Sequence, residues 1–419
     1  MSTLFARSDP IFPVAQIRAG IGRTLRARTV ASIGALLCAA CTSVPTAKVD
    51  SEAVTRYRDS GYPLPAQRAI ETHRVGGSPS ELPWAISLTR PTDGGPHPLI
   101  VYLPSLGQAD NAPNHWIGVW ARAGYDVIAI QPLNDDAQVW ATDEARSGDF
   151  ERVASARFRD ALMAERLARL SALLGQIRQR SLRGELGLER LDWSGLALAG
   201  ADLGAFTVQT IASSPEGKLA AISWPLQPLA YIAISPYAVR NGASAGPANA
   251  PVLMISARDD VDAYGVIKDP SLRRLAFDRL GDGDNYYFEL GSATHRWLGG
   301  TIGPAASGEP APRHAPAPFN EGDRKNKRGG TAAPRDAMAP GGDDEETSPD
   351  KSASNAALRA ELVKARSRAL THEALSEVSF AAVSVAFLDA YLRRQAAARA
   401  WLAAAAPKWL QEGDRLKHR

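Results

Sequence analysis

The sequence predicts an α/β fold in which an eight-stranded, mostly parallel sheet is flanked by helices. Between Asp50 and Ser292, short apolar runs alternate with helix-like stretches, and glycine, proline and aspartate separate them. Runs such as Leu99–Leu103 and Val252–Ile255 are apolar at every position rather than at alternate ones. Continuous apolarity is expected of strands that are buried on both faces. With 419 residues, the chain is long enough to bury a large core.

Eight strands and one covering helix are predicted within this region. The strands are Ala69–Val75, Pro83–Thr89, Pro98–Leu103, Tyr125–Gln131, Leu196–Gly200, Tyr231–Ser235, Val252–Ser256 and Tyr286–Leu290. Between the fourth and fifth strands, leucines recur at helical spacing with charge on the opposite face, which predicts a helix over Arg152–Arg178. The segment Pro236–Ala250 after the sixth strand is too short for a large helical cap.

Composition excludes several classes of protein. The two cysteines cannot form a disulfide framework, and no Cys/His cluster has the spacing of zinc ligands. A formal net charge of +3 over the whole chain is too diffuse for a nucleic-acid interface. The chain has no GxxxxGK[ST] or HExxH motif, and no GxGxxG at a strand-to-helix turn. We therefore expect no cofactor, no metal and no nucleic-acid partner.

Residues 1–40 have the pattern of a signal peptide. Five arginines and one aspartate precede the apolar run Val30–Ala40, which is too short to cross a bilayer. Cys41 follows two alanines, as in a bacterial lipobox, although Cys38 stands where leucine is usual. The two interpretations are a lipoprotein signal, which we favour, and an ordinary secretory signal. We expect a chain exported to the bacterial envelope and anchored to the outer membrane by a lipid on Cys41, or otherwise a periplasmic or secreted one.

The remaining segments differ sharply in composition. Residues 41–65 are expected to form an exported linker, and residues 66–300 the core of the domain. Residues 301–356 are rich in glycine, alanine, proline and charge, which predicts a disordered insertion. Apolar residues at helical spacing predict that residues 357–405 form one or two long helices that complete the domain, before a tail at 406–419. The signal peptide holds the excess positive charge, because removing its five arginines and one aspartate leaves a net charge of −1 from Cys41 onward.

One strand-to-helix turn has the spacing of a nucleophile elbow. Gly200 and Gly204 flank Asp202 directly after the fifth strand, and small residues are needed there because the turn strains the backbone. The seventh strand ends in Asp259 and Asp260, and the eighth is followed by His295. This is the chain order of nucleophile, acid and histidine in α/β-hydrolases. The loop after Leu103 can offer backbone N–H groups for an oxyanion hole, together with the N–H of Leu203.

These segments resemble the α/β-hydrolases related to dienelactone hydrolases and platelet-activating-factor acetylhydrolases. In that group the matching segments read like V-x-S-H-G-L-G-G, G-H-S-F-G-A, P-x-L-x-x-x-G-x-x-D and G-A-T-H. The residues that match them are Leu106 at the oxyanion position, Gly200, Gly204 and Ala205 at the turn, Pro251 and Asp260, and Ser292–His295. The resemblance runs from Ala69 to Gly300 and resumes at Val385–Leu392. It implies an α/β-hydrolase fold and a small ester-like substrate.

The same resemblance implies a role for each candidate residue. Asp202, Asp260 and His295 occupy the triad positions, and the backbone N–H groups of Leu106 and Leu203 form the oxyanion hole. One departure is central, because Asp202 stands where the group has its nucleophilic serine. Two carboxylates beside one imidazole also favour its charged form.

Three interpretations of Asp202 follow. It can be a nucleophile, as in haloalkane dehalogenases and epoxide hydrolases, although the H-G-x-P loop and the cap of those enzymes are missing here. It can be a general base that acts on water beside His295. The third interpretation is loss of activity, which would leave a silent envelope protein with a binding role. Trp297 and Tyr264 are candidates for lining a pocket or for ordinary packing. The sequence does not identify a protein partner.

Overall fold

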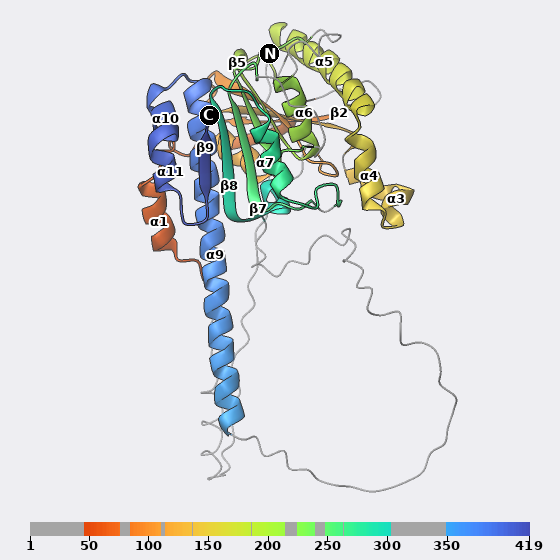
Figure 1. Cartoon of the computed structure of the whole chain (residues 1–419). Helices are drawn as coiled ribbons and strands as arrows, with labels where there is room; N and C mark the ends of the chain where they lie inside the picture. The colour runs from red at the N-terminus through yellow and green to blue at the C-terminus, as the bar shows by residue number, and fades with distance from the viewer. Residues whose placement is uncertain are drawn as a thin grey trace, which may run out of the picture. The chain divides into compact units, whose positions relative to one another are not determined.

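The computed structural model describes residues 46–75, 84–109, 114–135, 137–185, 187–213, 224–238, 248–262, 264–302 and 349–419. Residues Ala47–Arg419 form one compact unit, whose elements are labelled in Figure 1. The predicted signal peptide, Cys41 and most of the predicted insertion, residues 303–348, lie outside the described residues.

A mixed, mostly parallel sheet forms the centre of this unit, as the sequence predicts. Within the described residues it has nine strands, in the order β1-β2-β4-β3-β5-β6-β7-β8-β9. The strands are β1 (Ile70–Arg74), β2 (Trp84–Pro91), β3 (His97–Leu103), β4 (Asp126–Pro132), β5 (Leu191–Ala201), β6 (Ala230–Ile234), β7 (Val252–Asp259), β8 (Asn285–Thr294) and β9 (Arg415–His418). The strands from β3 to β8 run parallel, whereas β2 is antiparallel to β1 and β4, and β9 is antiparallel to β8.

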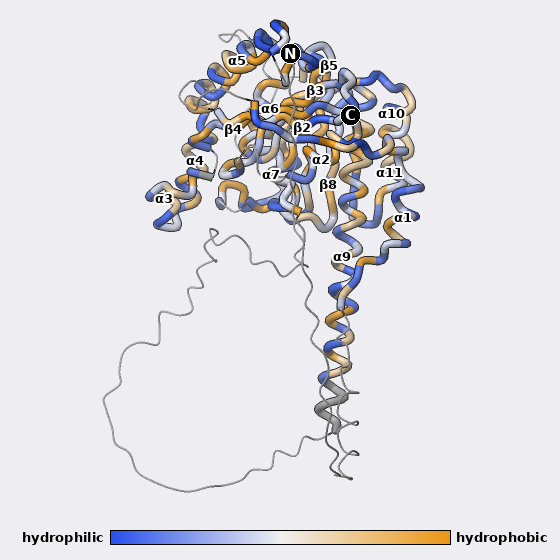
Figure 2. The backbone as a smooth tube through the Cα atoms, turned by 180° about the vertical axis from the view of Figure 1, so that it is seen from behind, coloured by the Kyte–Doolittle hydropathy of each residue, from blue (hydrophilic) through white to orange (hydrophobic). Residues whose placement is uncertain are grey.

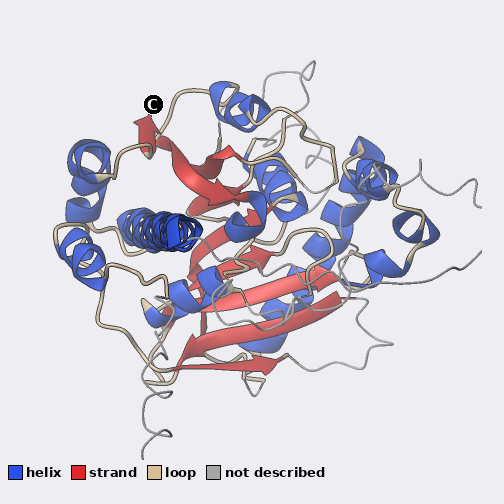
Figure 3. Ribbon diagram, turned by 90° about the horizontal axis from the view of Figure 1, so that it is seen from below, coloured by secondary structure: helices blue, strands red, loops and turns tan. Residues whose placement is uncertain are grey.

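Helices cover both faces of the sheet, as the view along α9 in Figure 3 shows. One layer consists of η1 (Ala137–Ala141), α3 (Asp143–Arg146), α4 (Phe150–Arg157), α5 (Asp160–Leu182), α6 (Leu203–Ala212) and α7 (Ser271–Asp278). The other consists of α2 (His115–Arg122), α8 (His295–Leu298), α9 (Pro349–Tyr391), α10 (Ala396–Ala400), η3 (Trp401–Ala405) and α11 (Ala406–Trp409). In β3, Leu99 and Val101 join the first core and Ile100 and Tyr102 the second. Both faces are buried, which explains the continuous apolar runs.

The helix expected over Arg152–Arg178 is two helices, α4 and α5. The first helix ends at Phe158. The ring of Phe158 packs in an aromatic cluster with Tyr237 and Phe206, at centroid distances of 4.6 and 5.6 Å. Packing of this ring against α6 overrides the helical periodicity, so the local pattern alone did not reveal the break.

The helix α9 extends further than the sequence suggests. It begins at Pro349, inside the segment expected to belong to the insertion, and proline is well tolerated in a first helical turn. By length and composition, Asn355–Tyr391 is the one described helix that could cross a membrane, but 72% of its most apolar stretch is buried in the domain. Phe380, Val383 and Phe387 belong to the second core. Their burial identifies this half of α9 as a core helix.

Part of the segment expected to be a linker, residues 47–65, and the whole segment expected to be a tail belong to the domain. Residues 47–65 include α1 (Ser51–Asp59), whose Tyr57 stacks on Trp409 at a centroid distance of 4.4 Å. Residues 406–419 include α11 and β9. Backbone hydrogen bonds of 3.1 and 3.0 Å join Asn285 and Arg419 in both directions and extend the pairing of β9 with β8. The expected sheet of eight strands therefore gains a ninth.

Candidate active site

The turn between β5 and α6 has the tight geometry that its two glycines predict. A Cβ atom added to Gly200 would lie 2.5 Å from the backbone carbon of Gly204. One added to Gly204 would lie 1.9 Å from the carbonyl oxygen of Leu103. Only glycine fits at either position, so α6 begins in direct contact with the end of β3. Asp202 lies between the two glycines with φ 51° and ψ −110°, a backbone conformation that residues other than glycine rarely adopt.

The side chain of Asp202 is enclosed, with 2% of the residue exposed. Its backbone N–H donates to the carbonyl of Ile234 at 2.9 Å, so the turn is also tied to β6. The carboxyl oxygen Oδ2 has no hydrogen-bond partner among the described residues. Burial raises the pKa of the Asp202 carboxyl, and the positive charges of His295 and Arg273 offset only part of this effect. A strained backbone and an unpaired buried oxygen both mark this position as a functional candidate.

Asp260 and His295 are in direct contact. Asp260 follows β7, His295 begins α8, and Nδ1 of the imidazole lies 2.7 Å from Oδ1 of the carboxylate. The imidazole is 15% exposed, whereas the Asp260 carboxylate is fully buried. When Nδ1–H donates to Asp260, Nε2 is the nitrogen left to exchange a proton with water or substrate. The neighbouring Asp259 is exposed at the end of β7, so the structure distinguishes the two adjacent aspartates.

Hydrogen bonds hold the Asp260 carboxylate in its charged form. The hydroxyls of Ser256 and Ser235 donate to it at 2.9 and 3.2 Å. Burial alone would raise the pKa of Asp260, but the hydrogen bond from His295 and the charge of Arg273 outweigh burial and hold it below its usual range. Asp202 and Asp260 thus have pKa values shifted in opposite directions. Such a divergence is typical of carboxyl groups that perform different roles in one site.

Arg273, on α7, is a member of this cluster that the sequence reasoning missed. Its guanidinium is fully buried, with Nε 3.4 Å from Oδ2 of Asp260 and Nη2 4.0 Å from Oδ2 of Asp262. Nη1 donates to the backbone carbonyls of Ser235 and Pro236 at 2.9 and 3.1 Å. One cation therefore neutralises two buried carboxylates and ties α7 to the ends of β6 and β7.

A signal for Arg273 was present in the sequence. Arg273 precedes Ala276 and Phe277 by three and four residues, so on a helix it shares their face. Those two residues are buried against the sheet. A charged residue on the apolar face of a short helix predicts a buried ion pair, whereas the adjacent Arg274 falls on the solvent face.

The proposed oxyanion residues lie beside the turn, but their roles remain predictions. Leu203 is the first residue of α6, and its backbone N–H helps to stabilise the Asp202 carboxylate. Leu106 is buried in the loop after β3, where its carbonyl oxygen accepts a hydrogen bond from the hydroxyl of Tyr264. The ring of Tyr264 stacks on Trp140 at a centroid distance of 5.6 Å, which fixes this loop.

Trp297 and Tyr264, the two aromatic candidates for lining a pocket, lie in different surroundings. Trp297 packs edge-on against Trp116 and Phe380 in the second core, at centroid distances of 4.7 and 6.1 Å. Tyr264 lies close enough to Asp202 for the carboxylate charge to contribute, after burial, to raising the pKa of its hydroxyl. The ring of Trp297 therefore belongs to the second core, whereas Tyr264 lies beside Asp202.

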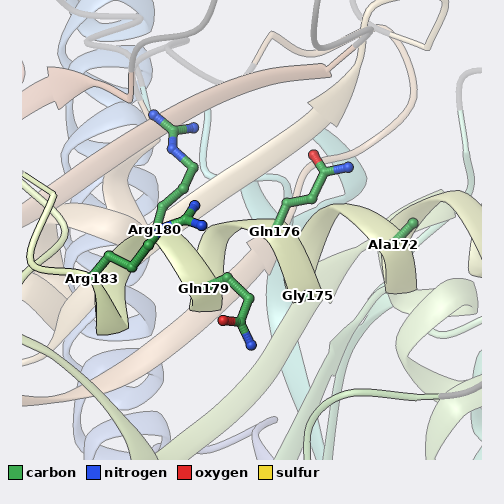
Figure 4. A pocket seen from close by; sticks show the side chains of 6 residues that line it. All are labelled: Ala172, Gly175, Gln176, Gln179, Arg180 and Arg183. Atoms are coloured by element: carbon green, nitrogen blue, oxygen red, sulfur yellow. The ribbon is translucent and has the colours of Figure 1, made fainter.

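A separate depression of about 560 Å³ lies against α5. Its lining residues, shown in Figure 4, are Ala172, Gly175, Gln176, Gln179, Arg180 and Arg183. None of them is a candidate site residue, and Arg180 already pairs with Glu185. Within the part of the chain that the structure describes, no group of three or more His, Cys, Asp or Glu residues could hold a metal ion.

Comparison with known proteins adds no family. No protein-family model matches the sequence, and no curated protein matches it significantly.

Removing the charge of Arg273 is expected to destabilise the fold strongly. Arg273→Met should lower the free energy of unfolding by about 3–5 kcal/mol, because it leaves Asp260 and Asp262 buried without their cation. Urea unfolding followed by circular dichroism measures the change. The matched control is Arg274→Met on the same helix, whose ion pair with Asp278 is half exposed. This control should change stability by no more than about 0.5 kcal/mol, and equal effects of the two variants would contradict the assignment.

Neutralising Asp202 is expected to stabilise the protein at neutral pH. The pKa of Asp202 is raised above its unfolded value of about 3.9, so ionisation in the fold costs free energy once the pH exceeds that value. Asp202→Asn should raise the free energy of unfolding by about 0.5–2 kcal/mol near pH 7. The gain should vanish below about pH 4, where both states hold the proton.

The pH series has its own control in Asp259→Asn, which changes an exposed carboxylate nearby. Thermal unfolding of parent and both variants from acidic to neutral pH gives the comparison. A destabilised Asp202→Asn protein at pH 7 would show that the fold needs this charge.

Proposed function

We propose that this chain is a hydrolase of the α/β-hydrolase fold that acts on small carboxylic ester-like substrates. The strand order supports this proposal, because β4 lies between β2 and β3 and the strands from β5 to β8 then follow in sequence. Further support comes from the tight turn after β5 and from the order of turn, acid and histidine along the chain.

The observation that carries the proposal is the state of Asp202. Its backbone keeps the strained geometry of a nucleophile turn, and its carboxyl is buried with one oxygen unpaired beside an assembled Asp260–His295 pair. Backbone strain and unpaired polar groups are costly, and proteins retain them chiefly at functional sites. A scaffold without chemistry would gain stability by relaxing both.

In the proposed reaction, water attacks the ester carbonyl. As the new C–O bond forms, a proton of the water passes to Nε2 of His295, and it then moves to the leaving alkoxide as the ester bond breaks. Asp260 orients the imidazole and stabilises its charged form. The backbone N–H of Leu106 would donate to the carbonyl oxygen, and that of Leu203 would join it on leaving the Asp202 carboxylate. Asp202 would hold the attacking water by accepting its second hydrogen, because direct attack by the carboxylate would give a high-energy anhydride.

The position of Asp202 also favours a second candidate reaction. A carboxylate at the tip of this turn stands where the nucleophile of the fold stands, and an ionised carboxylate needs no base to attack a saturated carbon. Displacement of a halide or opening of an epoxide would then give an ester on Asp202. Water activated by His295 would hydrolyse that ester. A silent binding protein is the alternative that the missing serine favours.

Esterase assays on matched variants test the proposal. Purified Cys41–Arg419 should hydrolyse short-chain aryl esters, and Asp202→Ala and His295→Ala should each lower kcat/KM by about 10²-fold or more, because each removes a group that handles the attacking water. The control Asp259→Asn should retain the parental rate. No hydrolysis by the parent above the level of the two alanine variants would overturn the ester proposal, and esterase activity only in Asp202→Ser would identify a silent scaffold.

A labelling arm separates water attack from carboxylate attack. During a single turnover in ¹⁸O-water, a covalent ester on Asp202 would leave ¹⁸O in that side chain after hydrolysis, which mass spectrometry detects. We expect no label in Asp202 during ester hydrolysis. Labelled Asp202 with a haloalkane or epoxide would establish the second reaction instead.

We also propose that the chain is exported and anchored by a lipid on Cys41. The arginine-rich start, the apolar run Val30–Ala40 and the two alanines before Cys41 support this. In a Gram-negative host fed an alkyne fatty acid, the parent should be labelled and Cys41→Ser should not, because the thiol carries the lipid. Cys38→Ser is the matched control and should keep the label. Absence of label from the parent would rule out the anchor.

A further inference from the structure

The N-terminal half of α9 extends beyond the rest of the domain. Figure 1 shows α9 continuing past the sheet as an isolated helix. We call Asn355–Leu370 the projecting segment, in which every side chain is exposed or only half-buried. Most helical stability in proteins comes from packing of an apolar face, and the two sides of the projecting segment differ in what they contact.

One side of the projecting segment is covered by the start of the described chain. The backbone N–H of Lys48 donates to the hydroxyl of Ser367 at 3.0 Å, and that of Asp50 donates to the hydroxyl of Thr371 at 2.9 Å. Val363 and Ser367 on this side are half-buried. Residues 48–50 therefore lie along one face of α9 and leave the opposite face to solvent.

The opposite face carries an apolar stripe. Leu358, Leu362, Ala365 and Ala369 recur at the spacing that aligns residues on one side of a helix, and all four are exposed. The two leucines are 60% and 61% exposed. In Figure 2 this part of α9 alternates between apolar and polar colours along its length. Two large apolar side chains facing water on one stripe are unusual for a helix of a soluble domain.

Basic side chains flank the stripe on both sides. By helical rotation, Arg359 and Arg366 lie on one flank, and Lys364 and Arg368 lie on the other, where Glu361 is 3.9 Å from Lys364. With Glu361 as the single acid, the projecting segment has a net charge of +3. The chain from Cys41 onward has a net charge of −1, so the remainder carries −4. The projecting segment is therefore positive, whereas the rest of the chain from Cys41 onward has a net negative charge.

The segment between Cys41 and Thr46 is long enough for a lipid on Cys41 and the apolar stripe of α9 to contact the same membrane. Thr46, the first described residue, follows Cys41 by five positions, so the two can be at most about 18 Å apart. Twelve helical residues separate Ser367 from Asn355, a rise of about 18 Å. A lipid on Cys41 and the outer stripe of α9 can therefore meet one bilayer, although the stripe does not require that lipid.

We propose that the projecting segment of α9 binds an anionic phospholipid surface. Leu358 and Leu362 enter the headgroup region, and Arg359 and Arg368 contact lipid phosphates. A basic amphipathic helix with a narrow apolar stripe is typical of helices that lie in the membrane interface rather than across it. Pairing with the same segment of a second copy would bring two +3 surfaces together, which charge repulsion opposes.

Vesicle co-sedimentation tests this proposal without the lipid on Cys41. Because Ala47–Arg419 is one compact unit, the chain from Thr46 to Arg419 is a suitable protein. It should bind vesicles of phosphatidylethanolamine and phosphatidylglycerol at least about tenfold more tightly than vesicles of phosphatidylcholine. Added salt should weaken binding. Leu358→Glu/Leu362→Glu and Arg359→Glu/Arg368→Glu should each reduce it by about tenfold or more.

The control variant is Leu182→Glu, which changes an equally exposed leucine, at 66%, on the end of α5. It should bind as the parent does, and unchanged thermal unfolding of all variants would establish that each is folded. No binding of the parent to phosphatidylglycerol vesicles, or an equal loss in Leu182→Glu, would overturn the proposal. Self-association that Leu358→Glu/Leu362→Glu abolishes, without vesicle binding, would assign the stripe to a second copy and also overturn it.

A fluorescent label locates the contact. Both cysteines of the chain precede Thr46, so Leu362→Cys introduces a unique thiol in the tested protein. An environment-sensitive fluorophore on this thiol should shift to the blue on anionic vesicles, because it enters the apolar interface. The same label on Leu182→Cys should not shift. Equal spectra for the two positions would contradict insertion of the stripe.

Discussion

The close approach of α6 to the end of β3 is the constraint on which the candidate site depends. With no side chain at Gly204, the first turn of α6 reaches the Leu103 carbonyl, and the backbone between Gly200 and Gly204 has room for only one path. That path holds Asp202 at positive φ, while its N–H bonds β6. The ends of the parallel strands β7 and β8 lie at the same edge of the sheet. They bring Asp260 and His295 to the turn although they are far away in the sequence.

Electrostatics divides the two carboxyl groups that meet there. Asp260 accepts hydrogen bonds from two serine hydroxyls and from His295, and it faces Arg273, so its charged form is favoured despite full burial. Asp202 is equally buried but keeps one oxygen unpaired, so the loss of water dominates and its pKa rises. The difference therefore arises from the number of donors each carboxyl meets. Arg273 links the two carboxyl groups, because it contacts Asp260 and its charge also reaches Asp202.

The sequence predicted most of what strong local patterns encode. All eight predicted strands are present. The inner ones are easiest to predict, because continuous apolar runs are hard to explain outside a sheet buried on both faces, whereas the edge strand β1 is polar and partly exposed. The two glycines around Asp202 predicted the turn, because only a tight crossing requires both. Weak patterns failed: β9 contributes one apolar residue, Leu416, and α1 docks mainly by stacking Tyr57 on Trp409. Arg273 was missed because no helix was predicted over Ser271–Asp278, and only on a helix does Arg273 share the buried face of Ala276 and Phe277.

The helix α9 shows why composition alone cannot assign an environment to a helix. Its most apolar stretch passes a test for membrane spans, yet that stretch is the part buried against the sheet. The projecting segment is less apolar, but its leucines face water. A short isolated helix is marginal in water, and this one continues from a half that tertiary packing has already nucleated. Hydrogen bonds from the backbone of Lys48 and Asp50 stabilise one side of it. The projecting segment is therefore already helical before a surface binds its other side. Binding has no folding cost to offset, so apolar contact and charge contribute directly to the affinity.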